Sequence, residues 1–276
     1  MRLACVQAHV AFGDPAANVE SLRRTLRDLK TRGVDLAVFP ECFLTGYCFR
    51  SREEALEGAI RRDDPALARI VACVDELDAG AIVGFAETDG ERVYNTAALF
   101  EPGEAPWFYR KTHLPELGLD KFVTPGEDLP VFDTRWGKIG ILICFDQRQP
   151  EAARVLAMKG AELIALPTNW PEGAENSAEV MCVARAAENR VFYAACNRAG
   201  EERTFRFIGR SKIIAPNGAI LAAAGAEEET LVCDLDLSEA RQKRAVVRPG
   251  EYEWTIFDSR RPELYEALTE PAKAPR

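Results

Sequence analysis

The fold is decided by nine residues, Gly33-Val34-Asp35-Leu36-Ala37-Val38-Phe39-Pro40-Glu41, which place an apolar run between a glycine and a proline. A run interrupted only by one aspartate is typical of a strand that is buried on both faces of a parallel sheet. Upstream, Asp14-Pro15 has the form of a helix N-cap followed by proline at the first helical position. Apolar residues then recur at helical spacing from Val19 to Leu29. The sequence therefore predicts a helix that ends at Gly33 and a buried strand after it.

A second segment of the chain repeats this order of elements. Residues 152–159 are predicted to form a helix, Gly160 ends it, and residues 161–166 form another apolar run. The aligned pairs are Gly33 with Gly160, Asp35 with Glu162, Leu36 with Leu163, Pro40 with Pro167 and Glu41 with Thr168. Because ligands of open α/β sheets bind near the carboxyl ends of strands, Glu41 and residues 168–170 are expected at a common mouth. We therefore predict two related α/β halves within one domain.

Length and composition narrow the class of protein. The chain has 276 residues, of which 47% are hydrophobic, and it carries a formal net charge of -9. A partner with a phosphate backbone needs a basic face, so we expect no nucleic-acid partner. No run of 18 apolar residues occurs and the N-terminus lacks the pattern of a signal peptide, so we expect no membrane span and a cytoplasmic protein. No linker divides the chain, which predicts a single domain over residues 1–270 and a flexible tail over 271–276.

The cysteines do not form a metal-binding pattern. They stand at positions 5, 42, 48, 73, 144, 182, 196 and 233, with no Cys-x-x-Cys pair, and the chain has only two histidines. We therefore expect no metal site, and no disulfides in a reducing compartment. Most of these cysteines lie in apolar runs, where a cysteine is an ordinary small buried side chain.

Three segments place reactive residue types near the ends of predicted strands. They are Val38 to Glu41, Tyr109 to Pro115, and Gly140 to Asp146. Cys144, at the end of an apolar strand predicted over residues 139–144, directly precedes a polar turn and a predicted helix. A helix N-terminus lowers the pKa of a thiol and supplies N–H groups to an oxyanion, so this position suits a nucleophile. A buried structural cysteine is the alternative that position alone leaves open.

These segments resemble the three active-site blocks of the nitrilase superfamily, the carbon–nitrogen hydrolases. Further blocks follow the order of that family over nearly the whole chain: Leu3-Ala4-Cys5-Val6-Gln7, Asn95-Thr96-Ala97, Thr124-Pro125-Gly126, Arg185-Ala186-Ala187-Glu188-Asn189, Asn197-Arg198-Ala199-Gly200, Phe207-Ile208-Gly209 and Arg261-Pro262-Glu263-Leu264-Tyr265. The resemblance implies a four-layer α/β/β/α sandwich. It also implies a homodimer or larger homo-oligomer and no cofactor.

The resemblance further implies a catalytic triad of Glu41 as general base, Lys111 as electrostatic stabiliser and Cys144 as nucleophile. Burial is expected to raise the pKa of Glu41, and the Lys111 ammonium is expected to favour the thiolate. The ammonium and the backbone N–H of Phe145 would hold the tetrahedral oxyanion, and the cycle would pass through a thioester that water hydrolyses. A cysteine–histidine dyad that uses His113 is the rival mechanism.

The remaining candidates depart from the family pattern or concern the substrate. The second glutamate of many relatives falls near Leu119 here, so Asp120 is our choice for that carboxylate and Glu116 is the alternative. Arg148 matches an arginine of relatives that take carboxylate-bearing substrates, because a guanidinium grips a carboxylate at two points. A surface pairing with Glu151 or another carboxylate is the other interpretation of Arg148. Asn169 and Trp170 are candidates for the pocket wall, although packing under a loop is a common role for such a tryptophan.

We therefore predict a cysteine-dependent hydrolase of a small linear non-peptide amide, with a carboxylate-bearing substrate as the specific form suggested by Arg148. An N-carbamoyl amine or amino-acid hydrolase is the alternative, and a nitrilase comes third. A catalytically silent scaffold that only binds partners is the hypothesis from another class, and the complete triad argues against it.

Overall fold

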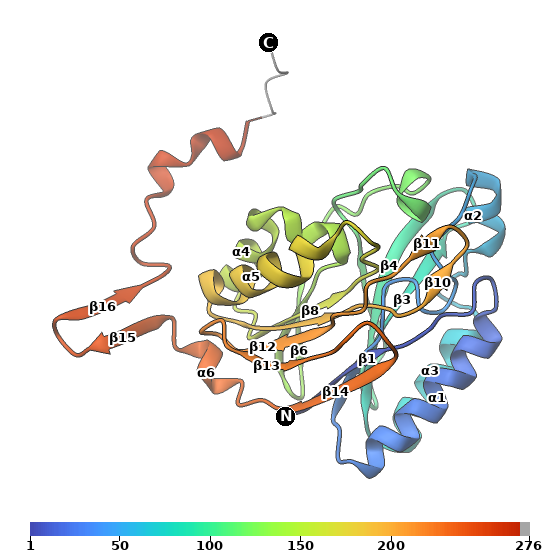
Figure 1. Ribbon diagram of the computed structural model, residues 1–276, viewed down its shortest axis with the longest axis horizontal. Coiled ribbons are helices and arrows are strands. Elements are labelled where there is room, and N and C mark those ends of the chain that lie inside the picture. Colours follow the sequence, from blue (N-terminus) through green and yellow to red (C-terminus); the bar gives the residue numbers. More distant parts are fainter. Residues whose placement is uncertain (271–276) are drawn as a thin grey trace. The chain divides into compact units, whose positions relative to one another are not determined.

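Helix α1 (Pro15–Thr31) forms as the sequence predicts in the computed structural model, which describes residues 1–270 (Figure 1). The Asp14 carboxylate caps it by accepting a hydrogen bond of 3.0 Å from the Ala17 N–H. The apolar residues from Val19 to Leu29 are buried. Gly33 ends the helix region with φ +71°, a conformation that glycine adopts without steric cost.

The first sheet follows from the apolar runs of the N-terminal half. Its strands are β1 (Arg2–Gln7), β2 (Leu36–Val38), β3 (Gly80–Thr88), β4 (Val93–Phe100), β5 (Trp107–Arg110) and β14 (Glu229–Asp234). They lie in the order β14-β1-β2-β3-β4-β5, in which β1, β2 and β3 run parallel and the other pairings are antiparallel.

The second sheet has the same plan. Its strands are β6 (Val131–Thr134), β7 (Gly137–Ile141), β8 (Leu163–Pro167), β9 (Phe192–Cys196), β12 (Lys212–Ile214) and β13 (Ile220–Ala223). In the order β6-β7-β8-β9-β12-β13, the three strands β7, β8 and β9 are parallel and the flanking pairings are antiparallel. Strand β8 therefore occupies the place of β2, and the prediction of two related halves is confirmed.

Helices cover the outer faces of both sheets. Helices α1 and α3 (Pro65–Leu77) share an apolar core with the first sheet, while α4 (Pro150–Met158) and α5 (Cys182–Asn189) cover the second (Figure 1). Strands β1 and β2 contact β9 and β8, so the inner faces of the two sheets pack against each other. The predicted α/β/β/α sandwich is confirmed.

Shorter elements connect these layers. They are α2 (Arg52–Gly58), α6 (Ser238–Arg241), β10 (Glu201–Glu202), β11 (Phe205–Arg206), the 3-10 helices η1 (Gly118–Lys121) and η2 (Cys144–Arg148), and the π-helical turn η3 (Ser177–Met181). The strand that the sequence predicts up to Cys144 ends at Ile141 instead. Cys144 has φ +43°, which breaks the extended backbone and begins η2.

The chain divides into two units, Met1–Arg241 and Gln242–Arg276. The first contains both sheets. The described part of the second contains the antiparallel hairpin of β15 (Arg244–Arg248) and β16 (Tyr252–Thr255), followed by the 3-10 helices η4 (Pro262–Leu264) and η5 (Glu266–Leu268). A single domain over 1–270 stays a prediction, and the predicted tail over 271–276 lies outside the described residues. Within residues 1–270 no helix is long and apolar enough to cross a membrane.

Candidate active site

The nucleophile candidate Cys144 lies on a strained turn between β7 and α4. Its φ of +43° is uncommon for a residue with a side chain, and such conformations cluster at functional sites. The Asp146 carboxylate holds the turn by accepting a hydrogen bond of 2.9 Å from the Ile143 N–H. Cys144 as a residue is partly exposed, in contrast to Ile143 and Asp146 beside it, which are buried.

The electrostatic surroundings keep this thiol protonated at rest. Burial raises the pKa of Cys144 to about 12, and the nearby Glu41 charge adds to this effect. The Lys111 ammonium acts in the opposite direction, as do the Thr168 hydroxyl and the Asn169 backbone N–H. The expectation that the turn lowers the pKa of the free thiol is therefore wrong, because burial and the adjacent carboxylate outweigh the donors. For this thiol to act as a nucleophile, a base would have to remove its proton.

Lys111 lies between two buried carboxylates. Its Nζ is 2.8 Å from Glu41 Oε1 and 2.6 Å from Asp120 Oδ2, and all three side chains are buried. Burial lowers the pKa of Lys111, but the Asp120 and Glu41 charges outweigh it, and the pKa lies well above its usual value. Lys111 is therefore an ammonium with fixed orientation.

Two further side chains complete this network. The Asn95 amide donates to Glu41 Oε1 at 2.7 Å and to Asp120 Oδ1 at 2.8 Å. The Tyr47 hydroxyl donates to Asp120 Oδ2 at 2.8 Å. Both carboxylates are therefore held in place by neutral donors as well as by the ammonium.

Glu41 has the properties of a general base. Burial raises its pKa, as expected, and the Asp120 charge does the same, while Lys111 and Asn95 act against them. Both of its side-chain hydrogen bonds go to Oε1, and Oε2 has no partner within residues 1–270. An oxygen without a donor can accept a proton without first breaking a hydrogen bond.

The site is assembled from both sheets. Glu41 follows β2 and Lys111 follows the edge strand β5 of the first sheet, whereas Cys144 follows β7 of the second. The Asn169 amide, after β8, donates to the Glu41 backbone carbonyl at 2.9 Å. This contact confirms that the ends of β2 and β8 share one mouth.

Asp146 connects the nucleophile turn with the lysine segment. Its carboxylate accepts hydrogen bonds of 2.7 Å from the Tyr109 hydroxyl, 3.0 Å from the Thr112 hydroxyl and 2.9 Å from the His113 N–H. The His113 Nδ1 also lies 2.9 Å from the same carboxylate. The ring of His113 is therefore held toward Asp146, which does not favour the rival cysteine–histidine dyad.

The remaining predicted residues lie in different environments. Phe145 is half-buried next to the nucleophile, while Asn169 and Trp170 are buried. The Trp170 backbone pairs with the Asn197 amide, an arrangement that supports its loop. Arg148 is exposed, its guanidinium lies 5.9 Å from the centre of the Phe145 ring, and it donates to the Ser177 hydroxyl at 3.4 Å. No described carboxylate lies within ion-pair distance of Arg148, so the alternative pairing with Glu151 is not formed.

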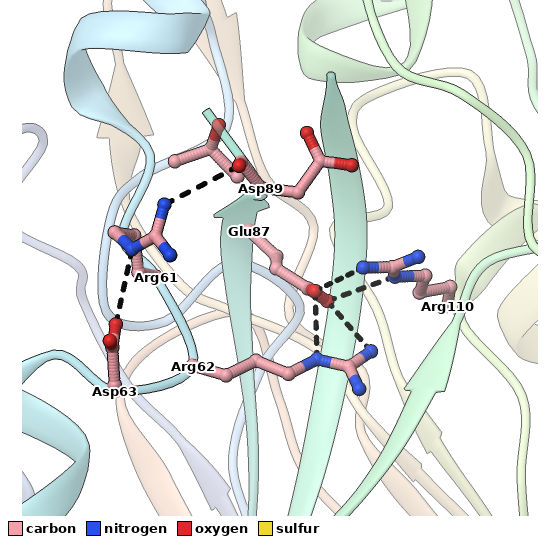
Figure 2. Close-up of a pocket in the computed structure, with 7 residues that line it drawn as sticks. Arg61, Arg62, Asp63, Glu87, Asp89 and Arg110 are labelled. Carbon is pink, nitrogen blue, oxygen red and sulfur yellow. Dashed lines mark hydrogen bonds and ion pairs between the residues drawn. The ribbon is translucent and has the colours of Figure 1, made fainter. Parts of the chain in front are cut away.

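A second charged cluster surrounds Glu87 and includes Arg62 and Arg110 (Figure 2). The buried Glu87 carboxylate on β3 accepts hydrogen bonds from Arg62 and Arg110, and Arg110 directly precedes Lys111. The Arg110 guanidinium also lies 3.4 Å from the centre of the Tyr94 ring. These contacts hold the end of strand β5 in place, directly before Lys111. The cluster lines a surface cavity of about 330 Å³ together with Arg61, Asp63, Thr88 and Asp89.

Sequence reasoning assigned no role to Asn95, Tyr47 or Glu87. Asn95 interrupts the apolar run of β4, and Glu87 interrupts that of β3. A polar residue within a strand that is buried along its length needs a partner, and this signal was available in the sequence. Of the two carboxylates considered beside Lys111, Asp120 is buried against the ammonium and Glu116 is exposed.

Known proteins are similar to this chain in sequence and in fold. The family model described as carbon-nitrogen hydrolase matches residues 2–245. A nitrilase of Pyrococcus abyssi is 36% identical over 270 residues, covering 96% of this chain and 99% of its own. An N-carbamoylputrescine amidase of Solanum tuberosum is 30% identical, covering 92% of this chain and 90% of its own. A mutant of the amidase from Nesterenkonia sp. AN1, described with acrylamide added at its active site cysteine, has a TM-score of 0.82 at 25% identity and covers 97% and 99%. The chain belongs to the carbon-nitrogen hydrolases of the nitrilase superfamily and is a hydrolase of carbon–nitrogen bonds other than peptide bonds.

Proposed function

We propose that this protein hydrolyses a small linear amide through a thioester on Cys144. Glu41 takes the thiol proton as the sulfur attacks the amide carbon, and the same proton then passes to the leaving amine or ammonia. Glu41 next activates the water that cleaves the thioester and restores the thiol. The single observation that carries this proposal is the buried arrangement of Lys111 between Glu41 and Asp120.

The raised pKa of Cys144 determines how the attack proceeds. Because the resting thiol is protonated, proton transfer to Glu41 accompanies the formation of the carbon–sulfur bond. Negative charge then moves from the carboxylate to the oxygen of the tetrahedral intermediate. The Lys111 ammonium and the Phe145 N–H are our candidates for holding that oxyanion, and one such donor is typically worth about 3–4 kcal/mol.

Asp120 orients the ammonium in this scheme. With Glu41 neutralised by the proton, Asp120 keeps Lys111 charged and in position. The Tyr47 and Asn95 hydrogen bonds hold Asp120 still, so the ammonium is preorganised for the intermediate. This role corresponds to the second carboxylate of many relatives.

We propose a carboxylate-bearing substrate on the basis of Arg148. Its guanidinium stands four residues after the nucleophile, beside Phe145, and within residues 1–270 no carboxylate neutralises it. A guanidinium without a carboxylate partner can bind a substrate carboxylate at two points. Asn169 is our candidate for a pocket-wall group, and Trp170 for the support behind it.

Two alternatives share the same catalytic residues. The relative named N-carbamoylputrescine amidase supports a carbamoyl substrate, and the relative named nitrilase supports a nitrile. The hypothesis of a catalytically silent scaffold is not supported, because the chain belongs to the carbon-nitrogen hydrolases. We also propose a cytoplasmic homodimer or larger homo-oligomer.

A substrate panel distinguishes these functions. Amides, N-carbamoyl compounds and nitriles, each with and without a carboxylate, are assayed with the wild type and with Arg148→Ala. Ammonia without carbon dioxide indicates an amide, both together indicate a carbamoyl group, and direct loss of nitrile indicates a nitrilase. Arg27→Ala, on helix α1, removes another exposed arginine and is the matched control.

Loss of Arg148 is expected to reduce kcat/KM for carboxylate substrates by about 10- to 100-fold, as for one charged hydrogen-bonded contact. Neutral substrates are expected to change little. An equal loss for both kinds of substrate would remove the carboxylate clamp from the proposal, and no turnover of any of these compounds would contradict the proposed substrate classes.

A further inference from the structure

Thr168 stands beside the nucleophile at the end of the neighbouring strand. Strand β7 pairs with β8 in parallel, with Ile141 opposite Ala165. The same offset, continued past the end of β7, pairs residue 168 with residue 144, and Thr168 does lie close enough to act on the Cys144 thiol. The Thr168 N–H donates to the Cys196 carbonyl at 2.9 Å, which fixes its backbone, and its side chain is fully buried.

In the resting structure the Thr168 hydroxyl makes no hydrogen bond within the described residues, but it lies close enough to Cys144 to favour the thiolate of that residue. Buried hydroxyl groups are nearly always hydrogen-bonded, so an unused one in a native fold needs an explanation. The neighbouring reactive group is the Cys144 sulfur, which becomes a hydrogen-bond acceptor of full negative charge only when it loses its proton.

Several charged and polar groups act on that sulfur. Glu41 disfavours the thiolate, whereas Lys111, the Thr168 hydroxyl and the Asn169 N–H favour it, as the pKa of Cys144 reflects. Lys111 is already held by two carboxylates, and its charge is needed at the oxyanion. The hydroxyl of Thr168 is the side-chain donor that remains for the sulfur.

The internal repeat gives an independent reason to examine this position. In the first half of the fold Glu41 follows β2, and in the second half Thr168 follows β8 at the equivalent place. One half thus supplies an acceptor for the thiol proton. The other supplies a hydroxyl that can donate to the sulfur after the proton has left.

We propose that Thr168 is a further catalytic residue, whose hydroxyl donates a hydrogen bond to the Cys144 sulfur as negative charge develops on it during attack and again when the thioester breaks. This inference rests on the proposed role of Cys144 as nucleophile. No covalent bond of Thr168 forms or breaks, since its proton stays on its own oxygen throughout.

The test measures thiolate formation without requiring a substrate. Alkylation of Cys144 by iodoacetamide is followed by peptide mass spectrometry in the wild type, Thr168→Val and Thr168→Ser. The pH runs from about 6 to 10, which lies below the raised pKa of Cys144, so the thiolate fraction rises with pH throughout. Valine removes the hydroxyl at nearly constant shape, and serine keeps it. Cys233, which is also partly exposed, is the internal reference in every sample.

At a fixed pH on the rising part of the profile, Thr168→Val is expected to alkylate Cys144 about ten-fold more slowly, as for loss of one hydrogen bond to a charged group. Thr168→Ser is expected to stay within about two-fold of the wild type, because it retains the donor. Cys233 is expected to react equally in all three proteins.

Equal Cys144 profiles in the valine variant and the wild type would overturn the proposal. Thr168→Ala replaces valine if that variant does not fold, with the same expected slowing. If no amide is hydrolysed but the Cys144 profile still shifts, the proposed function fails and the role of Thr168 stands. If amides are hydrolysed and the profile does not shift, the role of Thr168 alone fails.

Discussion

The substitution Asp120→Asn would remove the charge of one of the two carboxylates that hold Lys111, at almost constant shape. Asp120 accepts three hydrogen bonds, from Lys111 and Tyr47 on Oδ2 and from Asn95 on Oδ1. The introduced asparagine can keep its oxygen toward Lys111 and Tyr47. Its amide nitrogen then faces the amide nitrogen of Asn95, and two donors meet without an acceptor.

These contacts determine how much Asp120→Asn is expected to lower the free energy of unfolding and kcat. One lost hydrogen bond with a buried donor left unsatisfied lowers the free energy of unfolding by about 1–3 kcal/mol. The ammonium also loses a charged partner worth about 1.5–3 kcal/mol, which predicts a fall in kcat of about 10- to 100-fold. KM is expected to change less, because Asp120 acts through Lys111.

The pH dependence of kcat/KM in Asp120→Asn is expected to shift in a direction that a merely structural defect would not produce. The Asp120 charge raises the pKa of Glu41, so its removal lowers that pKa. Glu41 must be deprotonated to act as base, and activity is lost as the pH falls through its pKa. The acid limb of kcat/KM in Asp120→Asn is therefore expected at lower pH than in the wild type.

The assay is ammonia release from the best amide of the panel between about pH 4 and 9, which spans the usual carboxyl pKa and the range above it. The control is Asp128→Asn, which neutralises an exposed aspartate 3.5 Å from Lys159. An acid limb that moves to higher pH would contradict the effect of the Asp120 charge on Glu41. A kcat equal to that of the control would contradict the role of Asp120 in orienting Lys111.

Glu87→Gln is expected to lower the free energy of unfolding by about 2 kcal/mol at neutral pH, because it breaks the paired hydrogen bonds to Arg110. Burial raises the pKa of Glu87, but its partners outweigh burial and lower it, so this stabilisation exists above the usual carboxyl range and disappears in acid. Thermal melts from about pH 7 down to pH 3 should show the difference from the wild type narrowing; a constant difference would exclude the ion pair. Asp146→Asn is expected to lower kcat about ten-fold with a smaller change in KM, since one of its two oxygens no longer accepts the donors that join the Cys144 and Lys111 segments. Unchanged kinetics would remove Asp146 from the positioning of the site.

Much of the fold follows from local chemistry. The Asp14-Pro15 cap, the apolar spacing after it and Gly33 predicted α1 and β2 because each rule acts within a few residues. The same rules apply to Asp64-Pro65, which caps α3 in the same way. Helix α3 was therefore predictable from the same cap-and-proline pattern.

The site was predictable in part. Strand ends and block order made Glu41, Lys111 and Cys144 the catalytic candidates, since these signals depend on residue type and sequence position. The Asn95 bridge was not predictable, because it depends on which face of β4 meets which loop. The raised pKa of Cys144 was also missed, because burial depends on the packing of two sheets that lie far apart in the sequence.

The most direct test of the account is capture of the acyl group on Cys144. The wild type and Cys144→Ala are mixed with an excess of the best amide, quenched in acid on the millisecond to second scale, and analysed by intact mass and peptide mapping. An added acyl mass is expected on the Cys144 peptide of the wild type, and turnover is expected to fall by at least about 1,000-fold in Cys144→Ala. Turnover that persists in Cys144→Ala, or an acyl group on another residue, would contradict the role of Cys144 as nucleophile.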